Sequence, residues 1–254
     1  MKREDDADQL SRRQLFRSAI AAGGALTAAN LLSPEEAEAA ESSLKKGGVV
    51  LFQGDSITDA GRNRRNQSPN NSGALGRGYA FLLASHLLAN HPTKQLKVYN
   101  RGISGHKVPD LDKRWQKDTI DLKPDILSIL IGVNDIWHKL NGRYKGTVAS
   151  YETGFAALLE RTKKALPNTK IAVCEPFVLR CGAVSDKWFP EFDERRAAAK
   201  KVAKEAGTLW VPFQTMFDNA IKDAPPKYWA GDGVHPSVAG HALMAKEWLK
   251  VVKP

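Results

Sequence analysis

Four features that often indicate the class of a protein are missing from this sequence. No run of about 18 apolar residues is present, so no membrane-spanning helix is predicted. The six histidines lack the His-Glu-x-x-His pattern and any paired-cysteine context, so we expect no metal and no other cofactor. The Gly-x-Ser-x-Gly signature does not occur, which argues against an α/β-hydrolase elbow. Internal repeats and low-complexity linkers are absent as well.

The composition is ordinary for a globular protein, but the charge is strongly positive. Of the 254 residues, 42% are hydrophobic and 26% are charged, which suits one domain with a sizeable core. The formal net charge of +10 favours anionic partners such as nucleic acid, acidic lipid or acidic polysaccharide. The basic residues are nevertheless spread along the chain, mostly on expected helix faces, which favours a solvated surface. Because no nucleic-acid-binding motif accompanies the charge, we expect no nucleic acid partner.

The N-terminus resembles a bacterial targeting segment. Residues 11–17 read SRRQLFR and resemble a twin-arginine export motif, with Leu and Phe in swapped order. A weakly apolar stretch follows, and then the small-x-small cleavage pattern AEA, which ends at Ala39. We predict that residues 1–39 are a signal peptide, with Ala40 as the rival cleavage position. Residues 40–254 would then be exported to the periplasm or beyond the cell, with no stable membrane insertion. The alternative is an exposed amphipathic helix.

The chain has two cysteines, Cys174 and Cys181. In an exported protein they can form a disulfide that closes a small loop, and the oxidising environment outside the cytoplasm favours this disulfide. The alternative is two reduced thiols, one of them buried in a strand. A thiol count on the native protein distinguishes these possibilities.

Strand and helix signals alternate after residue 48. Five apolar runs predict strands at residues 49–52, 96–99, 126–131, 171–174 and 209–211. Periodic segments between and after them predict helices at residues 79–89, 109–121, 147–166 and 189–206, and a last helix that Ser237 caps and that runs to Val251. Residues 61–78 form an expected polar loop. Repeated strand-then-helix units with apolar strands predict a parallel, doubly wound α/β sheet covered by helices on both faces.

The first strand leads into Gly54-Asp55-Ser56. A serine at this position stands at the carboxyl edge of the sheet, where open α/β sheets place their ligand crevices. We interpret Ser56 as a nucleophile. The alternative is a plain strand-to-loop turn, because Gly, Asp and Ser are common turn residues.

Three further polar blocks lie where they can meet Ser56. Residues 100–105 follow the second predicted strand, residues 132–135 follow the third, and residues 232–236 precede the last helix. Since the carboxyl ends of parallel strands share one edge of the sheet, we expect these blocks to converge there.

These blocks supply the groups that acyl transfer requires. His235 would be the base, and Asp232 would accept a hydrogen bond from its Nδ1–H while Nε2 faces Ser56. The oxyanion donors would be the backbone N–H groups of Ser56 and Gly105 and the side-chain amide of Asn134. Taken singly, each residue has a structural alternative, such as a turn for the glycine or a helix cap for the asparagine.

Taken together, the four blocks resemble the SGNH hydrolase superfamily, also called the GDSL esterase/lipase family. The resemblance covers essentially the whole mature chain and implies a flavodoxin-like, three-layer α/β/α sandwich with five parallel strands. It also implies that Ser56, Asp232 and His235 are the catalytic triad and that Ser56, Gly105 and Asn134 form the oxyanion hole.

One departure from the family pattern is Ile57, where the family name has Leu. Residues 53–62, together with Trp137-His138 after the asparagine block, are similar to the bacterial branch that contains secreted polysaccharide acetylesterases. Trp137 and His138 could contact a sugar, and Arg62 could border the pocket and hold an anionic glycan. The alternatives are a core tryptophan and a solvated, mobile loop.

We therefore expect a secreted serine esterase that removes small acyl groups, with acetate as the expected group, from acetylated polysaccharide or oligosaccharide. A lysophospholipase or thioesterase is an alternative within the hydrolases, although no long apolar loop is present to house an acyl chain. A non-catalytic glycan-binding protein on the same fold is the alternative from another class.

Overall fold

A computed structural model describes residues 44–254 of the chain. The predicted signal peptide and its cleavage positions lie outside the described residues. Within them, five strands form one sheet in the order β2-β1-β3-β4-β5, and every neighbouring pair is parallel. The strands are β1 (Val49–Gly54), β2 (Lys97–Asn100), β3 (Ile126–Leu130), β4 (Lys170–Cys174) and β5 (Leu209–Val211). This is the flavodoxin-like order.

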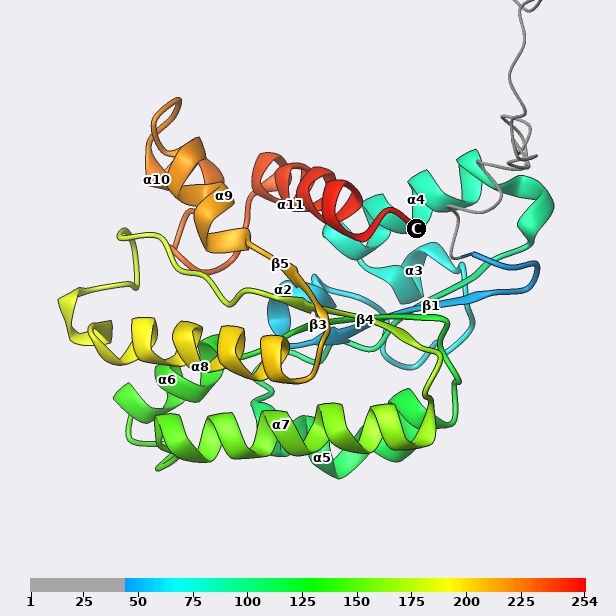
Figure 1. Cartoon of the computed structure of the whole chain (residues 1–254). Coiled ribbons are helices and arrows are strands. Elements are labelled where there is room, and N and C mark those ends of the chain that lie inside the picture. Colours follow the sequence, from blue (N-terminus) through cyan, green and yellow to red (C-terminus); the bar gives the residue numbers. More distant parts are fainter. Residues whose placement is uncertain (1–43) are drawn as a thin grey trace, which may run out of the picture. The chain divides into compact units, whose positions relative to one another are not determined.

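Helices cover both faces of this sheet. Figure 1 shows α4 (Tyr79–Asn90), α9 (Phe213–Ala220) and α11 (Val238–Val252) on one face, and α5 (Val108–Trp115), α7 (Val148–Ala165) and α8 (Glu191–Glu205) on the other. Residues of β1 alternate between the two faces, with Leu51 in the core under α5, α7 and α8 and Phe52 in the other core. The predicted three-layer sandwich is confirmed.

Buried side chains tie the last helix to the central strand. Trp248 of α11 is fully buried, and its Nε1–H donates to Oγ of Ser128 in β3 over 3.0 Å. Ser237 caps α11 as predicted, because its Oγ accepts the N–H of Gly240.

Several elements differ from the prediction. The helix expected at residues 109–121 ends as α5 at Trp115 and continues as a π-helical turn over Gln116–Ile120. The expected polar loop contains the short helix α3 (Ser72–Leu75). Four further helices were not predicted at all: α2 (Ser56–Asp59), α6 (Val133–Leu140), α9 and α10 (Pro226–Trp229). They are four to eight residues long and are formed by tertiary packing more than by a periodic pattern.

The disulfide that an exported location favours is not formed, because both cysteines are free thiols. Cys174 is buried on β4, where its Sγ lies 3.4 Å from Oγ of Ser128. Cys181 is half-buried and its Sγ donates to the carbonyl of Ala230 over 3.3 Å. The two sulfurs therefore contact different segments, β3 for Cys174 and the residue after α10 for Cys181.

Candidate active site

Ser56 begins the short helix α2 immediately after the carboxyl end of β1. Asp55 caps this helix, because its Oδ1 accepts the N–H of Ile57 over 3.0 Å. Burial raises the pKa of Asp55 to about 7, and the nearby Asp135 adds to the rise. The buried Asp55 side chain thus holds the start of α2 at the sheet edge. Because Asp55 bonds the backbone of Ile57, the hydroxyl of Ser56 is available to other partners.

The hydroxyl of Ser56 contacts the imidazole of His235. Oγ of Ser56 lies 2.8 Å from Nε2 of His235, and Nδ1 of His235 lies 2.6 Å from Oδ2 of Asp232. The neutral imidazole that carries its proton on Nδ1 donates to the carboxylate and accepts from the hydroxyl. The structure therefore brings together three of the predicted site residues, and their hydrogen bonds run in the order that proton transfer from serine requires.

Asp232 is held as a carboxylate by its own loop. Its Oδ1 accepts the N–H groups of Val234 and His235 over 2.9 and 2.7 Å. Partial burial on its own raises the pKa of Asp232, but the hydrogen bond from the His235 side chain and these backbone donors outweigh it and lower the pKa below its usual value. Asp232 is thus ionised at neutral pH and fixes the orientation of the ring.

The loop that follows β4 contacts the loop that carries Asp232 and His235 through backbone hydrogen bonds. The N–H of Leu179 donates to the carbonyl of Gly233 over 2.7 Å, and the N–H of Ala183 donates to the carbonyl of Asp232 over 2.8 Å. Gly182 between them has a φ of +60°, and a Cβ there would lie 2.5 Å from Cα of Asp232. Close backbone contact therefore fixes the loop that carries Asp232 and His235 against the loop that follows β4.

Gly105 lies in the loop after β2, the strand that neighbours β1. It has a φ of +82°, which favours glycine. The loop is attached to the nucleophile segment, because the N–H of Ile103 donates to the carbonyl of Gly54 over 3.1 Å and the N–H of Ser104 donates to Oδ2 of Asp59 over 3.0 Å. Gly105 is therefore fixed relative to the helix that begins at Ser56.

Asn134 lies in the first turn of α6, directly after β3 on the other side of β1. Its Nδ2 donates to the carbonyl of His106 over 3.2 Å, so the amide lies beside the residue that follows Gly105. This bond uses one of the two amide hydrogens of Asn134.

A family model described as the GDSL-like Lipase/Acylhydrolase family matches residues 52–243, from β1 into α11. The chain belongs to this GDSL family. It is a carboxylic ester hydrolase, because that is the chemistry of the family and of its curated relative.

The relatives of this GDSL hydrolase match it over most of their length. An acetylxylan esterase of Geobacillus stearothermophilus is 36% identical over 210 residues, which cover 81% of this chain and 94% of the relative. A solved structure from Parabacteroides merdae, described as a GDSL-like lipase, has 51% identity and a TM-score of 0.80, and the match covers 83% of this chain and 97% of that one. A structure of a mutant of Axe2, an acetyl-xylooligosaccharide esterase from Geobacillus, has 34% identity and a TM-score of 0.75, and the match covers 83% of this chain and 96% of that one.

Two residues proposed to bind substrate lie beside the site of the GDSL hydrolase. The ring of Trp137 on α6 is 6.0 Å from the ring of His235 and 5.6 Å from that of Trp188. The neighbouring His138 approaches Gly105, because its Cε1 would lie 3.7 Å from a Cβ built there. Burial, followed by the charges of nearby basic side chains, lowers the pKa of His138, which favours the neutral ring at neutral pH. Helix α6 thus forms one wall of the site.

Arg62 does not lie where the sequence suggested. The sequence left two interpretations open, a pocket-bordering arginine that holds an anionic glycan and a solvated, mobile loop, but Arg62 is only 6% exposed. Its Nε donates to the carbonyl of Gly102 over 2.7 Å, and burial lowers its pKa to about 10. Arg62 therefore contacts the loop that carries Gly105 from the interior, whereas Arg64, Arg65 and Arg77 are the exposed arginines of residues 61–78.

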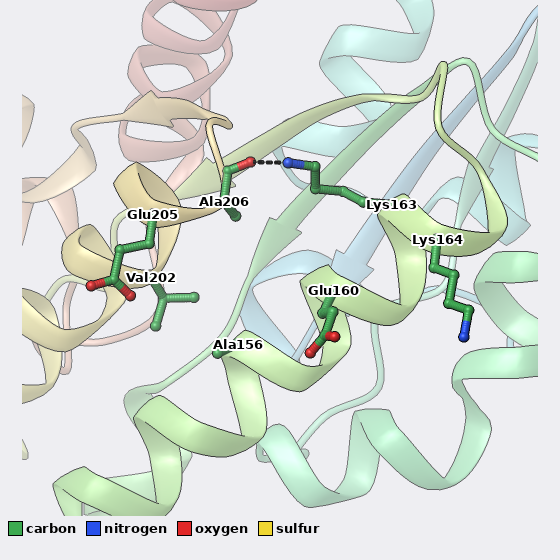
Figure 2. Close-up of a pocket in the computed structure, with 7 residues that line it drawn as sticks. All are labelled: Ala156, Glu160, Lys163, Lys164, Val202, Glu205 and Ala206. Carbon is green, nitrogen blue, oxygen red and sulfur yellow. Dashed lines mark hydrogen bonds between the residues drawn. The ribbon is translucent and has the colours of Figure 1, made fainter.

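A separate groove of the GDSL hydrolase lies between α7 and α8, and Figure 2 shows the side chains that line it: Ala156, Glu160, Lys163, Lys164, Val202, Glu205 and Ala206. Lys163 donates to the carbonyl of Ala206 over 2.7 Å. None of the candidate catalytic residues lines this groove. Among residues 44–254, we find no group of three histidine, cysteine or acidic side chains arranged to hold a metal ion, and no helix with the length and apolarity needed to span a bilayer.

Proposed function

We propose that the chain is a serine esterase that removes acetyl groups from carbohydrate through a Ser56–His235–Asp232 triad. The observation that carries this proposal is the pair of contacts from Oγ of Ser56 to Nε2 of His235 at 2.8 Å and from Nδ1 of His235 to Oδ2 of Asp232 at 2.6 Å. Both are within the range of short hydrogen bonds, and they connect a hydroxyl, a base and a carboxylate in series.

The first half of the reaction forms an acyl-enzyme. Nε2 of His235 takes the proton of Ser56 as Oγ attacks the acetyl carbonyl carbon, and Asp232 stabilises the imidazolium that results. The negative oxygen of the tetrahedral intermediate accepts from the N–H groups of Ser56 and Gly105 and from Nδ2 of Asn134. When the intermediate collapses, the imidazolium returns its proton to the departing sugar oxygen, and acetyl remains on Ser56.

The second half releases acetate. A water molecule replaces the sugar, His235 takes a proton from the water, and the hydroxide attacks the acetyl-serine carbonyl. The same three donors hold the second tetrahedral intermediate. Its collapse breaks the bond to Oγ of Ser56, which recovers its proton from His235, and acetate leaves.

The comparisons support acetylated xylooligosaccharide or a related acetylated glycan as the substrate. The curated relative is an acetylxylan esterase, and two catalytic mutants of Axe2 replace a serine and a histidine with alanine, the same residue types as Ser56 and His235. Trp137 provides an aromatic face next to His235 on which a sugar ring can pack. His138 would be an adjacent polar contact.

Three measurements test the proposal. Activity should be highest on p-nitrophenyl acetate and fall as the acyl chain lengthens, and acetate should be released from acetylated xylan. Preference for long chains would indicate a lipase or lysophospholipase, and binding of polysaccharide without turnover of any ester would indicate a glycan-binding protein. Ser56→Ala should abolish hydrolysis with an unchanged melting temperature; retention of most activity would contradict the assignment of Ser56.

We also propose that residues 1–39 are removed during export by the twin-arginine pathway and that residues 40–254 form the mature domain. The order of the arginine pair, the weakly apolar stretch and the AEA pattern supports this. N-terminal sequencing of exported protein should begin at residue 40 or 41. Export that survives replacement of both Arg12 and Arg13 by Lys, or an intact Met1 end, would contradict it.

A further inference from the structure

The guanidinium of Arg114 on α5 connects two segments of the candidate active site. Its Nη2 donates to the carbonyl of Gly54 over 3.3 Å, and its Nε donates to Nδ1 of His106 over 3.2 Å. Gly54 is the last residue of β1, two residues before Ser56, and His106 directly follows Gly105. One side chain therefore contacts both the strand that presents the nucleophile and the loop that presents an oxyanion donor.

An ion pair with Asp118 fixes the side chain of Arg114 in this position. Its side chain is 13% exposed, and Nη1 lies 3.2 Å from Oδ2 of Asp118 in the π-helical turn after α5. That turn is attached to β1, because Nε2 of Gln53 donates to the carbonyl of Asp118 and to Oγ1 of Thr119, each over 2.8 Å. The π-helical turn thus directs Asp118 at Arg114.

His106 connects Arg114 to the proposed oxyanion donors, because its ring contacts Arg114 and its backbone carbonyl contacts Asn134. Since Nδ1 of His106 accepts from Arg114, the proton of the neutral ring is on Nε2. Burial, and then the charge of Arg114, lowers the pKa of His106, which keeps Nδ1 available as an acceptor at neutral pH. The carbonyl of the same residue accepts Nδ2 of Asn134 over 3.2 Å.

We propose that Arg114 is a positioning residue for ester hydrolysis, acting through His106 to hold Gly105 and the amide of Asn134 at the correct distance from Ser56. This rests on the proposed function of Ser56 and of the two donors. Arginine is suited to the role because Nε–H and one Nη2–H lie on the same edge of the planar guanidinium and can engage two acceptors at once. A lysine ammonium in this place can reach one acceptor well but cannot hold both at the same fixed spacing.

Arg114→Met tests this proposal, because it keeps the length and apolar packing of the side chain and removes its donors. Removal of one oxyanion donor outright costs about 10²–10³-fold in kcat, so misplacing two donors by a fraction of an ångström should lower kcat on p-nitrophenyl acetate about 10–100-fold. KM should stay within about threefold of wild type, since the donors act mainly in the transition state. Arg114→Lys should restore part of the lost kcat.

The matched control is Arg161→Met. Arg161 on α7 also pairs with α5, through Asp112 at 2.9 Å, but is more exposed and contacts neither Gly54 nor His106. It should lose less than twofold in kcat. Equal losses in the two variants, a raised KM at unchanged kcat, or an Arg114→Met enzyme within twofold of wild type would each overturn the proposal.

Variants of His106 provide a second test, which breaks the same connection from its other partner. His106→Asn places a side-chain oxygen near the position of Nδ1 and should keep most of kcat, whereas His106→Leu removes the acceptor and should lose as much as Arg114→Met. The double variant that combines His106→Leu with Arg114→Met should be no slower than the slower single variant, because both changes break one connection. Losses that multiply would show two independent effects and contradict the relay. If Ser56→Ala stays active, the proposed function fails; if only the Arg114 and His106 variants stay active, this inference alone fails.

Discussion

Replacing Asp232 with asparagine should inactivate the enzyme without changing its shape. Oδ1 of Asp232 accepts two backbone N–H groups, from Val234 and His235. The amide oxygen of Asn must take this place, because an NH₂ group there would face two donors. The NH₂ group then faces Nδ1 of His235, which must become an acceptor. The ring proton moves to Nε2 and points at Ser56, so the base can no longer take the proton of the serine.

The size of the loss follows from two contributions. A hydrogen bond to a charged group contributes about 1.5–3 kcal/mol, which corresponds to roughly 10–100-fold in rate. An imposed wrong tautomer raises the loss in such triads to about 10⁴-fold. The side chains of Asp232 and His235 are 41% and 44% exposed, so water can stabilise part of the imidazolium charge. We therefore expect kcat to fall about 10³-fold, or about 4 kcal/mol in activation free energy.

The assay is the initial rate on p-nitrophenyl acetate across a range of substrate concentrations, together with thermal unfolding. The melting temperature should match wild type, because both backbone donors keep their acceptor. Asp223→Asn, at an exposed carboxylate, is the matched control and should leave kcat unchanged. An Asp232→Asn enzyme within tenfold of wild-type kcat would refute this account of the base.

Three further outcomes follow from individual residues. Gly182→Ala should lower both kcat and the melting temperature, since its Cβ would overlap the backbone of Asp232, whereas Gly142→Ala, with φ of +69° but open space around it, should show the cost of backbone strain alone. Thiol titration should detect Cys181 in the native protein and Cys174 only after unfolding, because burial raises the pKa of Cys174 to about 12; thiols that become detectable only after reduction would contradict the free state. Burial lowers the pKa of His241 in the folded protein to about 4. As the pH falls, the unfolded chain therefore takes up this proton before the folded protein does. The free energy of unfolding should accordingly decrease by at most roughly 3 kcal/mol from about pH 6.5 down to about pH 4. Urea titrations of His241→Gln should show a flatter dependence; an unchanged one would exclude His241 as the cause.

The sheet could be predicted from the sequence because parallel strands buried on both faces are nearly continuous apolar runs. The core strands differ from the predicted ranges by at most two residues at either end, and the run at residues 209–211 matches β5 at both ends. The convergence of the four polar blocks followed from the same reasoning. Since parallel strands present their carboxyl ends at one edge, Ser56, Gly105 and Asn134 were expected at the same edge. The structure places them after the neighbouring strands β1, β2 and β3.

The features that escaped prediction depend on contacts between distant segments. Helix α6 begins directly after β3, without a side-chain cap to mark its start. Arg62 looked like an exposed loop residue because nothing in its neighbours along the chain shows that the carbonyl of Gly102 will cover it. The contact between Arg114 and His106 likewise requires α5 to be packed on the sheet, and spacing along the chain does not encode that.

The packing of α11 has a consequence for shortened forms of the protein. His235 precedes this helix by only three residues, and α11 carries the fully buried Trp248. Loss of a large buried aromatic side chain alone costs about 3–5 kcal/mol, a substantial part of the roughly 5–15 kcal/mol that keeps a domain folded. A premature stop codon or a proteolytic cut that removes His235 would therefore unfold the domain as well. A folded form of this enzyme without the imidazole of residue 235 has to arise by substitution, not by trimming from the carboxyl terminus.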